Sequence, residues 1–356
     1  MAKYLLVDSL NTFFRARHSA PRRAYNWDKI GFAIHVTLSI VNKSYQKEQA
    51  DHVVFCTEGK SWRKELYKPY KANRKELMDA KSAAQTEEDE EFLEAYKEMI
   101  DFIREQTNCT VLHNDIAEAD DLIARWIHKH PDDEHIILSS DSDFVQLVTD
   151  KVTIYNGINN YLIKKDGYFD DNGKPVMENV KARDKSGKLL KEEKMVRNKL
   201  VLQQVMTKQA KPAPDVKWEL FVKCMRGDTS DNIFSAYPGV RTNGTVDKVG
   251  LREAFIDMES KGFKWNNLML QRWSDHSGNE HRVLDDYLRN VELVDLTAQP
   301  EDVKAYIDDS IDEQVCVDKK PHVGRYFLRF CGKYDLDKLS SFSTQYTRWL
   351  SNTYDS

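Results

Sequence analysis

The chain has 356 residues, of which 40% are hydrophobic and 31% are charged, and its formal net charge is −5. This length can bury a large core in one elaborated domain or two, and no apolar run approaches the roughly 20 residues that a membrane span requires. The five cysteines are far apart and form no CxxC pair, so we expect no zinc site, no disulfide framework and a reducing, cytoplasmic environment.

Short apolar runs alternate with helical patterns over the first 156 residues. The first run, KYLLVD, meets a charge too early for a signal peptide. The apolar runs predict strands at 3–8, 51–56, 109–113, 135–140 and 151–156. Apolar residues at helical spacing predict helices at 27–45, around 92–103 and at 117–130. This alternation predicts an α/β fold with a mostly parallel central sheet and helices on both faces.

The chain changes character after residue 156. Residues 157–200 are polar and rich in lysine, with turn signals at DDNGKP and DKSGK, so we expect an inserted hairpin region or a mobile loop. Helices are predicted at 215–227 and 246–258, and the remainder is expected to be helical. These patterns predict a core over residues 1–200 and a smaller, mainly helical part over residues 201–356.

Acidic residues follow four of the predicted strands. They are Asp8 after the first strand, Glu58 after the second, Glu118, Asp120 and Asp121 after the third, and Asp141 and Asp143 after the fourth. In an open parallel sheet, ligands bind outside the carboxyl ends of the strands, so these side chains should meet at one edge. A further pair, Asp228 and Asp231, has the i,i+3 spacing that places two side chains on one helical face.

So many carboxylates without a counter-charge would raise one another's pKa values and destabilise the fold. Asp141 and Asp143, for example, would point the same way in an extended chain. Divalent cations remove this difficulty, because Mg²⁺ prefers carboxylate, water and phosphate oxygens, and two such ions about 4 Å apart can support phosphodiester cleavage. A single Asp at a strand end is more often a helix N-cap, but four acidic strand ends together favour a metal site.

Six segments of the chain resemble the phage-type 5′-nuclease (flap endonuclease) superfamily, and within it the T-even phage ribonuclease H branch. They occur in the family's order over about residues 3–300 and read LLVDSLN, GKSWRKELYKPYKANR, AEADDLIA, SSDSDFVQL, RGDTSDNI and LRNVELVDL. The resemblance implies a PIN-like 5′-nuclease core. It also implies a metal-dependent nuclease that acts at 5′ ends of DNA, or of RNA in RNA·DNA duplexes, near junctions of single and double strand.

The resemblance assigns roles to the acidic residues. The inner ligands of Mg²⁺, for which Mn²⁺ can substitute, would be Asp8, Glu118, Asp120, Asp141 and Asp143. A second ion would be held, in part through water, by Asp121, Asp228 and Asp231. One position departs from the pattern, because relatives have an aspartate after the second strand where this chain has Thr57 and Glu58. Glu58 therefore ranks last among the expected ligands.

The segment WRKELYKPYKANR interleaves cations with Trp62, Tyr67 and Tyr70. Residues 1–75, which include it, hold 15 Lys/Arg against 6 Asp/Glu, whereas residues 76–121 hold 3 against 15. Such polarity suits binding of a polyanion, although two solvated faces explain it equally well. Phosphate contacts beside stacking surfaces are expected from Arg63, Lys64 and Lys68. A basic amphipathic helix on the surface is the alternative.

In the family this segment opens a helical arch over the active site. The resemblance implies an arch over about residues 59–105, with the acidic stretch 86–99 on its far side. Lys71 and Arg74 match the positions that reach the scissile phosphate, where a cation can stabilise developing charge.

The segment AYPGVRTNGTVDKVGLREAF (236–255) resembles the helix–turn–helix element with which the family binds duplex backbone. Amides at the start of a helix can face a phosphate, and we expect Arg241, Thr242 and Lys248 to contact phosphates. A plain surface turn is the alternative.

Together these features lead to the hypothesis of a Mg²⁺-dependent 5′-nuclease that removes flaps or RNA primers in phage DNA replication. We expect a cytoplasmic monomer without a membrane partner, and only family analogy implies a single-strand-binding protein or sliding clamp. Two alternatives stay open. A PIN-like ribonuclease for single-stranded RNA would explain the acidic strand ends but not the basic segment. A structure-specific DNA-binding protein with a decayed metal site is favoured only by the missing aspartate near Thr57.

Overall fold

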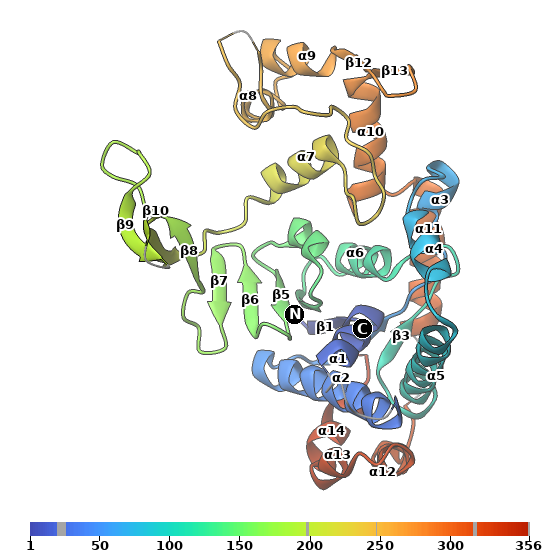
Figure 1. Cartoon of the computed structure of the whole chain (residues 1–356). Coiled ribbons are helices and arrows are strands. Elements are labelled where there is room, and N and C mark those ends of the chain that lie inside the picture. The colour runs from blue at the N-terminus through green and yellow to red at the C-terminus, as the bar shows by residue number, and fades with distance from the viewer. Residues whose placement is uncertain (20–25, 197–198, 247, 316–318, 355–356) are drawn as a thin grey trace.

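The computed structural model describes residues 1–19, 26–196, 199–246, 248–315 and 319–354. Figure 1 shows a core of strands and helices in the lower half of the view, a helical unit above it and a narrow β arm at the left. No helix in the described ranges is both long and apolar enough to cross a bilayer.

A seven-stranded sheet forms the centre of the core. Its strands are Lys3–Asp8 (β1), His52–Cys56 (β2), Thr110–Leu112 (β3), Glu134–Leu138 (β4), Val152–Asn156 (β5), Tyr161–Lys164 (β6) and Gly167–Asp170 (β7). Their order across the sheet is β3-β2-β1-β4-β5-β6-β7. The strands β1 to β5 pair in parallel, and β6 and β7 are antiparallel. The predicted α/β fold with a mostly parallel sheet is confirmed.

Helices cover both faces of this sheet. They are Ser9–Ser19 (α1), Asn26–Glu48 (α2), Ala83–Gln106 (α5), Ala119–Lys129 (α6), Glu301–Val315 (α11), Val323–Lys333 (α12), Asp337–Ser341 (α13) and Ser343–Leu350 (α14). Alternate residues of β1 point to opposite faces: Leu5 and Val7 pack with α1, α2, α5 and α12–α14, whereas Tyr4 and Leu6 pack with α6 and α11. Because side chains alternate along a strand, β1 contributes to the apolar core on each face of the sheet.

The strand order reverses at β1, because β2 and β3 lie on one side of it and β4 and β5 on the other. In parallel α/β sheets a crevice opens outside the carboxyl ends of the strands at such a point. β1 ends at Asp8 and β4 ends three residues before Asp141. The topology therefore brings these two carboxylates to the same crevice.

Residues 216–294 form a second unit with its own apolar core. Its elements are Val216–Arg226 (α7), Leu251–Ile256 (α8), Phe263–Met269 (α9), Arg272–Ser274 (β12), Glu280–Arg282 (β13) and Val283–Val294 (α10). Phe221, Trp265 and Leu268 are buried at its centre. Figure 1 shows this unit as the upper part of the molecule, with α7 facing the core.

The last helices do not belong to this second unit, which differs from the single C-terminal part predicted over residues 201–356. α11 packs on α6 and β3, and Phe327 of α12 and Trp349 of α14 join the apolar cluster of α2 and α5. A helical pattern shows which face of a helix is apolar, but it does not show which partner covers that face.

The stretch that was expected to form an arch contains two short helices, Arg63–Leu66 (α3) and Asn73–Asp79 (α4), followed by the long α5. The acidic start of α5 lies against basic residues of the core. Arg17 Nη1 is 2.6 Å from Asp89 Oδ1, and Lys29 Nζ is 3.1 Å from Glu88 Oε1. Part of the acidic stretch is thus neutralised within the protein.

Residues 157–211 form hairpins, one of the two structures expected for the polar region. After β6 and β7, the chain forms Met177–Lys181 (β8), Lys191–Val196 (β9), Lys199–Gln204 (β10) and Met206–Ala210 (β11). β8 pairs with β11 and β9 with β10, both antiparallel. We call residues 177–196 and 199–210 the β arm.

The cysteines agree with the expectation of free thiols as far as the structure describes them. Cys56, Cys109, Cys224 and Cys331 are buried and unpaired. Cys316 lies outside the described residues.

Candidate active site

The predicted acidic residues gather around one cavity of about 880 Å³. Its walls come from the start of α1 directly after β1, from the segments after β2, β3 and β4, and from α7 with the turn that follows it. Eight of the nine predicted metal ligands line it: Asp8, Glu58, Glu118, Asp120, Asp141, Asp143, Asp228 and Asp231. Lys71 and Arg74 line the same cavity. The residues predicted to act on phosphate therefore face those predicted to bind metal.

Asp8 is the most deeply buried carboxylate of this cavity at the end of β1. Its Oδ2 accepts a hydrogen bond from Ser139 Oγ at 2.8 Å, whereas Oδ1 is buried without a hydrogen-bond partner among the described residues. Burial, with the charges of Glu58 and Asp141, raises the pKa of Asp8 from 3.8 to about 7. Because an ionised, unpartnered oxygen is costly in the interior, this position needs a proton or a cation.

This raised pKa gives a prediction for the metal-free protein. Between pH 4 and pH 7 the folded protein keeps a proton on Asp8 that the unfolded chain has released, so the free energy of unfolding should fall as pH rises, by up to about 4 kcal/mol from this group. Urea denaturation with chelator, of wild type and of Asp8→Asn at pH 5 and pH 7.5, measures it. The wild type should lose more stability than the variant, and equal losses would refute the prediction.

The start of α6 provides a first group of carboxylates. Oxygen atoms within 4.8 Å of one another belong to Glu118, Asp120 and Asp121. Glu118 Oε2 accepts a hydrogen bond from the Tyr70 hydroxyl at 2.8 Å, and the Lys71 ammonium group contacts Glu118 Oε1. Although burial opposes it, Lys71 and Arg63 hold the pKa of Glu118 at about 2. Glu118 is therefore ionised at neutral pH.

Arg63 and Asp121 have a role that differs from the predicted ones. The Arg63 side chain is only 1% exposed and donates to Asp121 through Nη1 and Nη2, both at 2.8 Å. The Asp121 oxygens also accept from Trp62 Nε1 at 3.1 Å and from Gln299 Nε2 at 3.0 Å. Since these donors fill the lone pairs of the carboxylate, Asp121 is not available as a metal ligand. The expected DNA contact of Arg63 is wrong as well, because no phosphate can reach its buried guanidinium.

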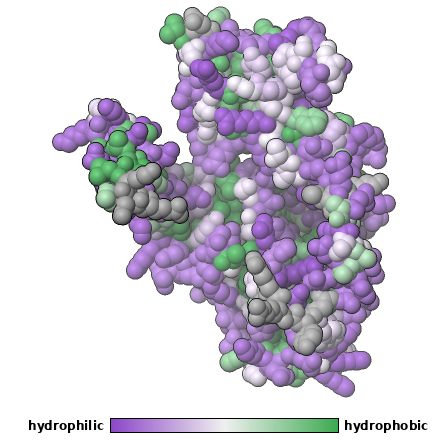
Figure 2. Space-filling model, viewed as in Figure 1, coloured by the Kyte–Doolittle hydropathy of each residue, from purple (hydrophilic) through white to green (hydrophobic). Residues whose placement is uncertain are grey.

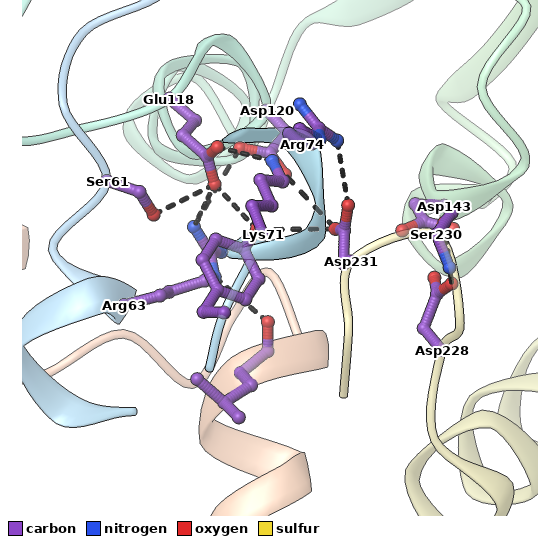
Figure 3. A network of polar contacts seen from close by, with 12 residues as sticks. Ser61, Arg63, Lys71, Arg74, Glu118, Asp120, Asp143, Asp228, Ser230 and Asp231 are labelled. Atoms are coloured by element: carbon purple, nitrogen blue, oxygen red, sulfur yellow. Dashed lines mark hydrogen bonds and ion pairs between the residues drawn. The ribbon is translucent and has the colours of Figure 1, made fainter. Parts of the chain in front are cut away.

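Lys71 lies between two acidic groups, as Figure 3 shows. Its ammonium group contacts Glu118 and lies 3.8 Å from Asp231 Oδ2. Its backbone is left-handed, with φ 54°, and its amide donates to the Asp231 carbonyl at 2.8 Å. A non-glycine residue in this conformation costs free energy and persists where the surrounding structure holds it. Arg74 Nη2 lies 2.8 Å from Asp231 Oδ1, nearer to solvent.

A second group of carboxylates surrounds Lys223 of α7. Oxygen atoms within 4.8 Å of one another belong to Asp143, Asp228 and Asp231. The Lys223 ammonium group contacts Asp143 and lies 2.7 Å from Asp228 Oδ2. Although burial opposes it, these carboxylates raise the pKa of Lys223 to about 12. Lys223 and Ser230 in turn hold the pKa of Asp228 at about 2 despite its partial burial.

Asp141 and Asp143 do not belong to one extended strand, contrary to what was assumed from the sequence. The strand ends at Leu138, and a short 3₁₀ helix, Ser142–Leu147 (η1), begins directly after Asp141. Asp141 Oδ1 caps this helix by accepting from the Asp143 amide at 3.0 Å, and its charge acts on Asp8. Asp143 groups with Asp228 instead. Both aspartates line the cavity and the charge of Asp141 also acts on Asp143, so their membership of one set of inner ligands stays a prediction.

Asp228 and Asp231 share a tight turn rather than a helical face. α7 ends at Arg226, and Gly227 follows with φ 74°. A Cβ at Gly227 would lie 2.2 Å from the Ile233 carbonyl oxygen, and Asp228 and Ile233 exchange both backbone hydrogen bonds. Only glycine fits this position, and the closed turn places both carboxylates on the cavity wall.

This donor set fits divalent cations that prefer oxygen. Carboxylates approach in two groups, one at the start of α6 and one formed by Asp143 with the turn after α7, and Asp8 Oδ1 is buried without a partner in the described part of the chain. Oxygen-only sites suit Mg²⁺ and Mn²⁺. Glu58 belongs to the same cavity; its Oε2 accepts from the Ala119 amide at 3.3 Å, and burial and Glu118 raise its pKa. Glu58 thus faces the cavity, and its role as a metal ligand stays a prediction.

Three residues of the site were missed or misjudged from the sequence. Lys223 was not singled out, although it stands five residues before Asp228 in the helix that leads into RGDTSDN. The acidic motif alone does not indicate that Lys223 neutralises two of its carboxylate partners, Asp143 and Asp228. Tyr70 and Trp62 were expected to be stacking surfaces, but both are buried. They donate to the acidic residues Glu118 and Asp121 instead.

The other predicted phosphate contacts lie on the surface. Lys64 and Lys68 are exposed in and just after α3. The loop between α7 and α8 contains Arg241, Thr242 and Lys248, and all three are exposed. This loop is held by Glu253, whose Oε2 accepts from the amides of Gly244 and Gly250 at 2.9 and 3.0 Å. The predicted helix over 246–258 is shorter and begins at Leu251.

Known proteins with similar sequences support a nuclease family. Residues 3–180 match the model of the 5′-3′ exonuclease N-terminal resolvase-like domain. The chain is 31% identical over 167 residues to the flap endonuclease Xni of Shewanella loihica, a match that covers 46% of this chain and 59% of that protein. The chain thus spans about three fifths of the length of this relative.

Solved structures with the same fold come from bacteriophage T5. One is its 5′-exonuclease with bound zinc ions, with a TM-score of 0.54 and 18% identity over 87% of this chain and 98% of that one. Another is its flap endonuclease in a pseudo-enzyme–product complex with DNA and metal ions, with a TM-score of 0.52, 18% identity and the same coverage. At this identity the likeness establishes the fold.

Proposed function

Since the chain belongs to the family of the 5′-3′ exonuclease N-terminal resolvase-like domain, we propose that it is a metal-dependent 5′-nuclease. It cleaves phosphodiester bonds near 5′ ends and at junctions of single and double strand, in DNA or in RNA·DNA duplexes. The observation that carries this proposal is the gathering of eight carboxylates with Lys71 and Arg74 around one cavity. The T5 relatives, which were crystallised with metal ions and in one case with DNA, support it.

The residues present would hold two divalent cations, Mg²⁺ or Mn²⁺. The first would be held by Asp8, Glu58, Glu118, Asp120 and Asp141, and the second by Asp143, Asp228 and Asp231. When bound, such ions neutralise phosphate charge and make water a better nucleophile. Lys71 and Lys223 neutralise the same carboxylates in the structure, so both ammonium groups become free to move toward a phosphate when cations take over that role.

The protein's own cations then act on the substrate. Lys71 stands between the two groups of carboxylates and Arg74 at the mouth of the cavity, where they stabilise charge on the scissile phosphate. Lys64 and Lys68 bind phosphates of the strand that enters. Arg241, Thr242 and Lys248 bind the duplex backbone from the second unit, across the cavity from the core.

A finer proposal concerns the biological substrate. The T-even ribonuclease H branch, which the sequence motifs resemble, implies removal of RNA primers or flaps during phage DNA replication. Two motifs of the chain, RGDTSDNI and PGVRTNG, resemble the corresponding motifs of that branch and support this proposal.

The test uses the full chain and two labelled substrates, a 5′-flap DNA duplex and an RNA·DNA hybrid. We expect cleavage near the junction with Mg²⁺ or Mn²⁺ and none with excess chelator. Cleavage confined to single-stranded RNA would replace the proposal with the ribonuclease alternative. Binding of the flap without cleavage in either metal would replace it with a binding protein.

A further inference from the structure

The β arm is a long two-stranded ribbon outside the nuclease core. It consists of two antiparallel pairs placed end to end: β10 pairs with β9, and β11 pairs with β8. Only Val205 separates β10 from β11. The Val205 carbonyl accepts from the Ala182 amide at 2.8 Å, and its amide donates to the Leu190 carbonyl at 3.1 Å, which joins the two ribbons. At about 3.3 Å per residue, residues 199–210 span about 40 Å.

The arm carries an excess of positive charge, with eight Lys/Arg against four Asp/Glu over residues 177–196 and 199–210. Exposed lysines on it are Lys181, Lys185, Lys188, Lys191, Lys194 and Lys208. Within the described ranges, none of these six forms an ion pair, whereas the neighbouring Lys165 and Lys217 outside the arm pair with Asp150 and Glu259. Exposed lysines without an ion pair on a projecting element are suited to a polyanion.

One face of the arm is apolar and exposed. Met195 and Leu200 are paired across the ribbon and Leu202 lies two residues further on the same face; each is more than 60% exposed. Figure 2 shows hydrophobic side chains gathered on the arm with hydrophilic ones around them. An isolated two-stranded ribbon is only marginally stable in water, so a surface that covers this face would stabilise the arm.

The arm is attached beside the active-site cavity. Its first strand follows Val176, whose amide donates to the Tyr168 carbonyl at the edge of the sheet. Its last strand leads to Lys211, whose ammonium group lies 3.6 Å from the centre of the Tyr168 ring. Five residues later Val216, the first residue of α7, lines the cavity. Figure 1 shows the arm projecting at the side of the space between the core and the second unit.

We propose that the β arm is a second duplex-binding element, which lies along a groove of the substrate duplex beyond the active site. This inference rests on the proposed function. A two-stranded ribbon fits the major groove, its lysines reach the phosphates on either side, and aliphatic side chains pack against base edges or sugars. Single-stranded nucleic acid fits less well, because stacking on unpaired bases requires aromatic side chains and residues 171–211 contain none.

The test measures binding with chelator present, so its result does not depend on cleavage. Fluorescence anisotropy compares flap substrates whose duplex has 8 or 24 base pairs, about 27 and 80 Å long. The test variant carries Lys181→Gln, Lys191→Gln and Lys194→Gln. On the long duplex, the magnitude of its negative slope of log K against log salt should decrease by about 2 to 3. On the short duplex it should not change, because the arm has no duplex to contact.

Two further variants complete the test. Arg325→Gln, Arg329→Gln, Lys338→Gln removes the same charge from exposed positions on α12 and α13 and should leave both slopes at the wild-type value. Leu200→Ser, Leu202→Ser should weaken binding of the long duplex without changing its slope.

An unchanged slope in the arm-lysine variant, or an equal fall for both lengths, would overturn the proposal and leave the apolar face to a protein partner. Failure of the proposed function would look different, since the wild type would then cleave neither substrate with Mg²⁺.

Discussion

Replacing Asp141 and Asp143 together by Asn is expected to lower the rate of flap cleavage about 10³-fold or more. The two residues divide between the cavity's acidic groups: Asp141 acts on Asp8, and Asp143 joins Asp228. One double variant therefore weakens both cation sites, which together supply several kcal/mol of charge stabilisation. Each loss of about 1.4 kcal/mol lowers the rate tenfold. Single-turnover cleavage of a labelled flap substrate at saturating Mg²⁺ measures the loss.

The same variant should fold normally. Asn keeps an oxygen that can accept from the residue 143 amide, as Asp141 Oδ1 does at 3.0 Å, and loss of two charges relieves repulsion in the metal-free protein. The melting temperature in chelator should therefore not fall.

A matched control is Asp132→Asn with Asp150→Asn, two exposed aspartates that precede β4 and β5 at the opposite edge of the sheet. The control should cleave at the wild-type rate. Wild-type cleavage by the Asp141 and Asp143 variant would remove the metal site from the proposal.

The second large effect is expected for Lys71→Met, which should slow cleavage about 10²- to 10³-fold while changing substrate affinity much less. The substitution keeps the length of the side chain and removes the charge that stands between Glu118 and Asp231. A donor aimed at charge that develops during the reaction contributes mainly to the rate. Rapid-mixing kinetics and anisotropy with chelator give the two quantities separately.

Lys64→Met is the control for Lys71, because Lys64 is an exposed lysine of the same segment. It should weaken binding slightly and leave the cleavage rate of bound substrate unchanged. If Lys71→Met lost rate and affinity in proportion, Lys71 would be an ordinary phosphate contact. Calorimetric titration of Mn²⁺ adds a further distinction. A lysine that only neutralises Glu118 should compete with the metal ion, so Lys71→Met would then bind Mn²⁺ more tightly than the wild type.

The site also shows how the fold tolerates its carboxylates. Divalent cations are not the only remedy for repulsion among these carboxylates. In the structure, Arg63 neutralises Asp121, Lys71 contacts Glu118, and Lys223 bridges Asp143 and Asp228. Breaking the buried pair of Arg63 and Asp121 would leave an uncompensated charge, at a cost of about 3–5 kcal/mol. Within the part of the chain that the structure describes, Asp8 has no such cation, which marks it as the position most in need of metal.

Much of the fold followed from local pattern. Apolar runs alternating with helical spacing predicted β1 to β5 and their covering helices, because burial of one strand or helix face leaves a period that is visible in the chain. Parallel strands have their carboxyl ends at one edge of the sheet, so the acidic residues at those ends could be expected to meet. The structure gathers Asp8, Glu58 and Asp141 at one cavity in that way.

Long-range packing decided the remainder. The sequence gives no sign that Arg63 would be buried against Asp121, 58 residues away, or that α11 to α14 would return to the core, because apolar faces are not specific for one partner. The turn into η1 placed Asp143 in a 3₁₀ helix instead of a strand, and the docking of α7 brought Lys223 between carboxylates. Residue types and their order along the chain thus determined which chemistry is present, and only the tertiary structure decided which charges are paired, since ion pairs depend on distances of a few ångströms between distant segments.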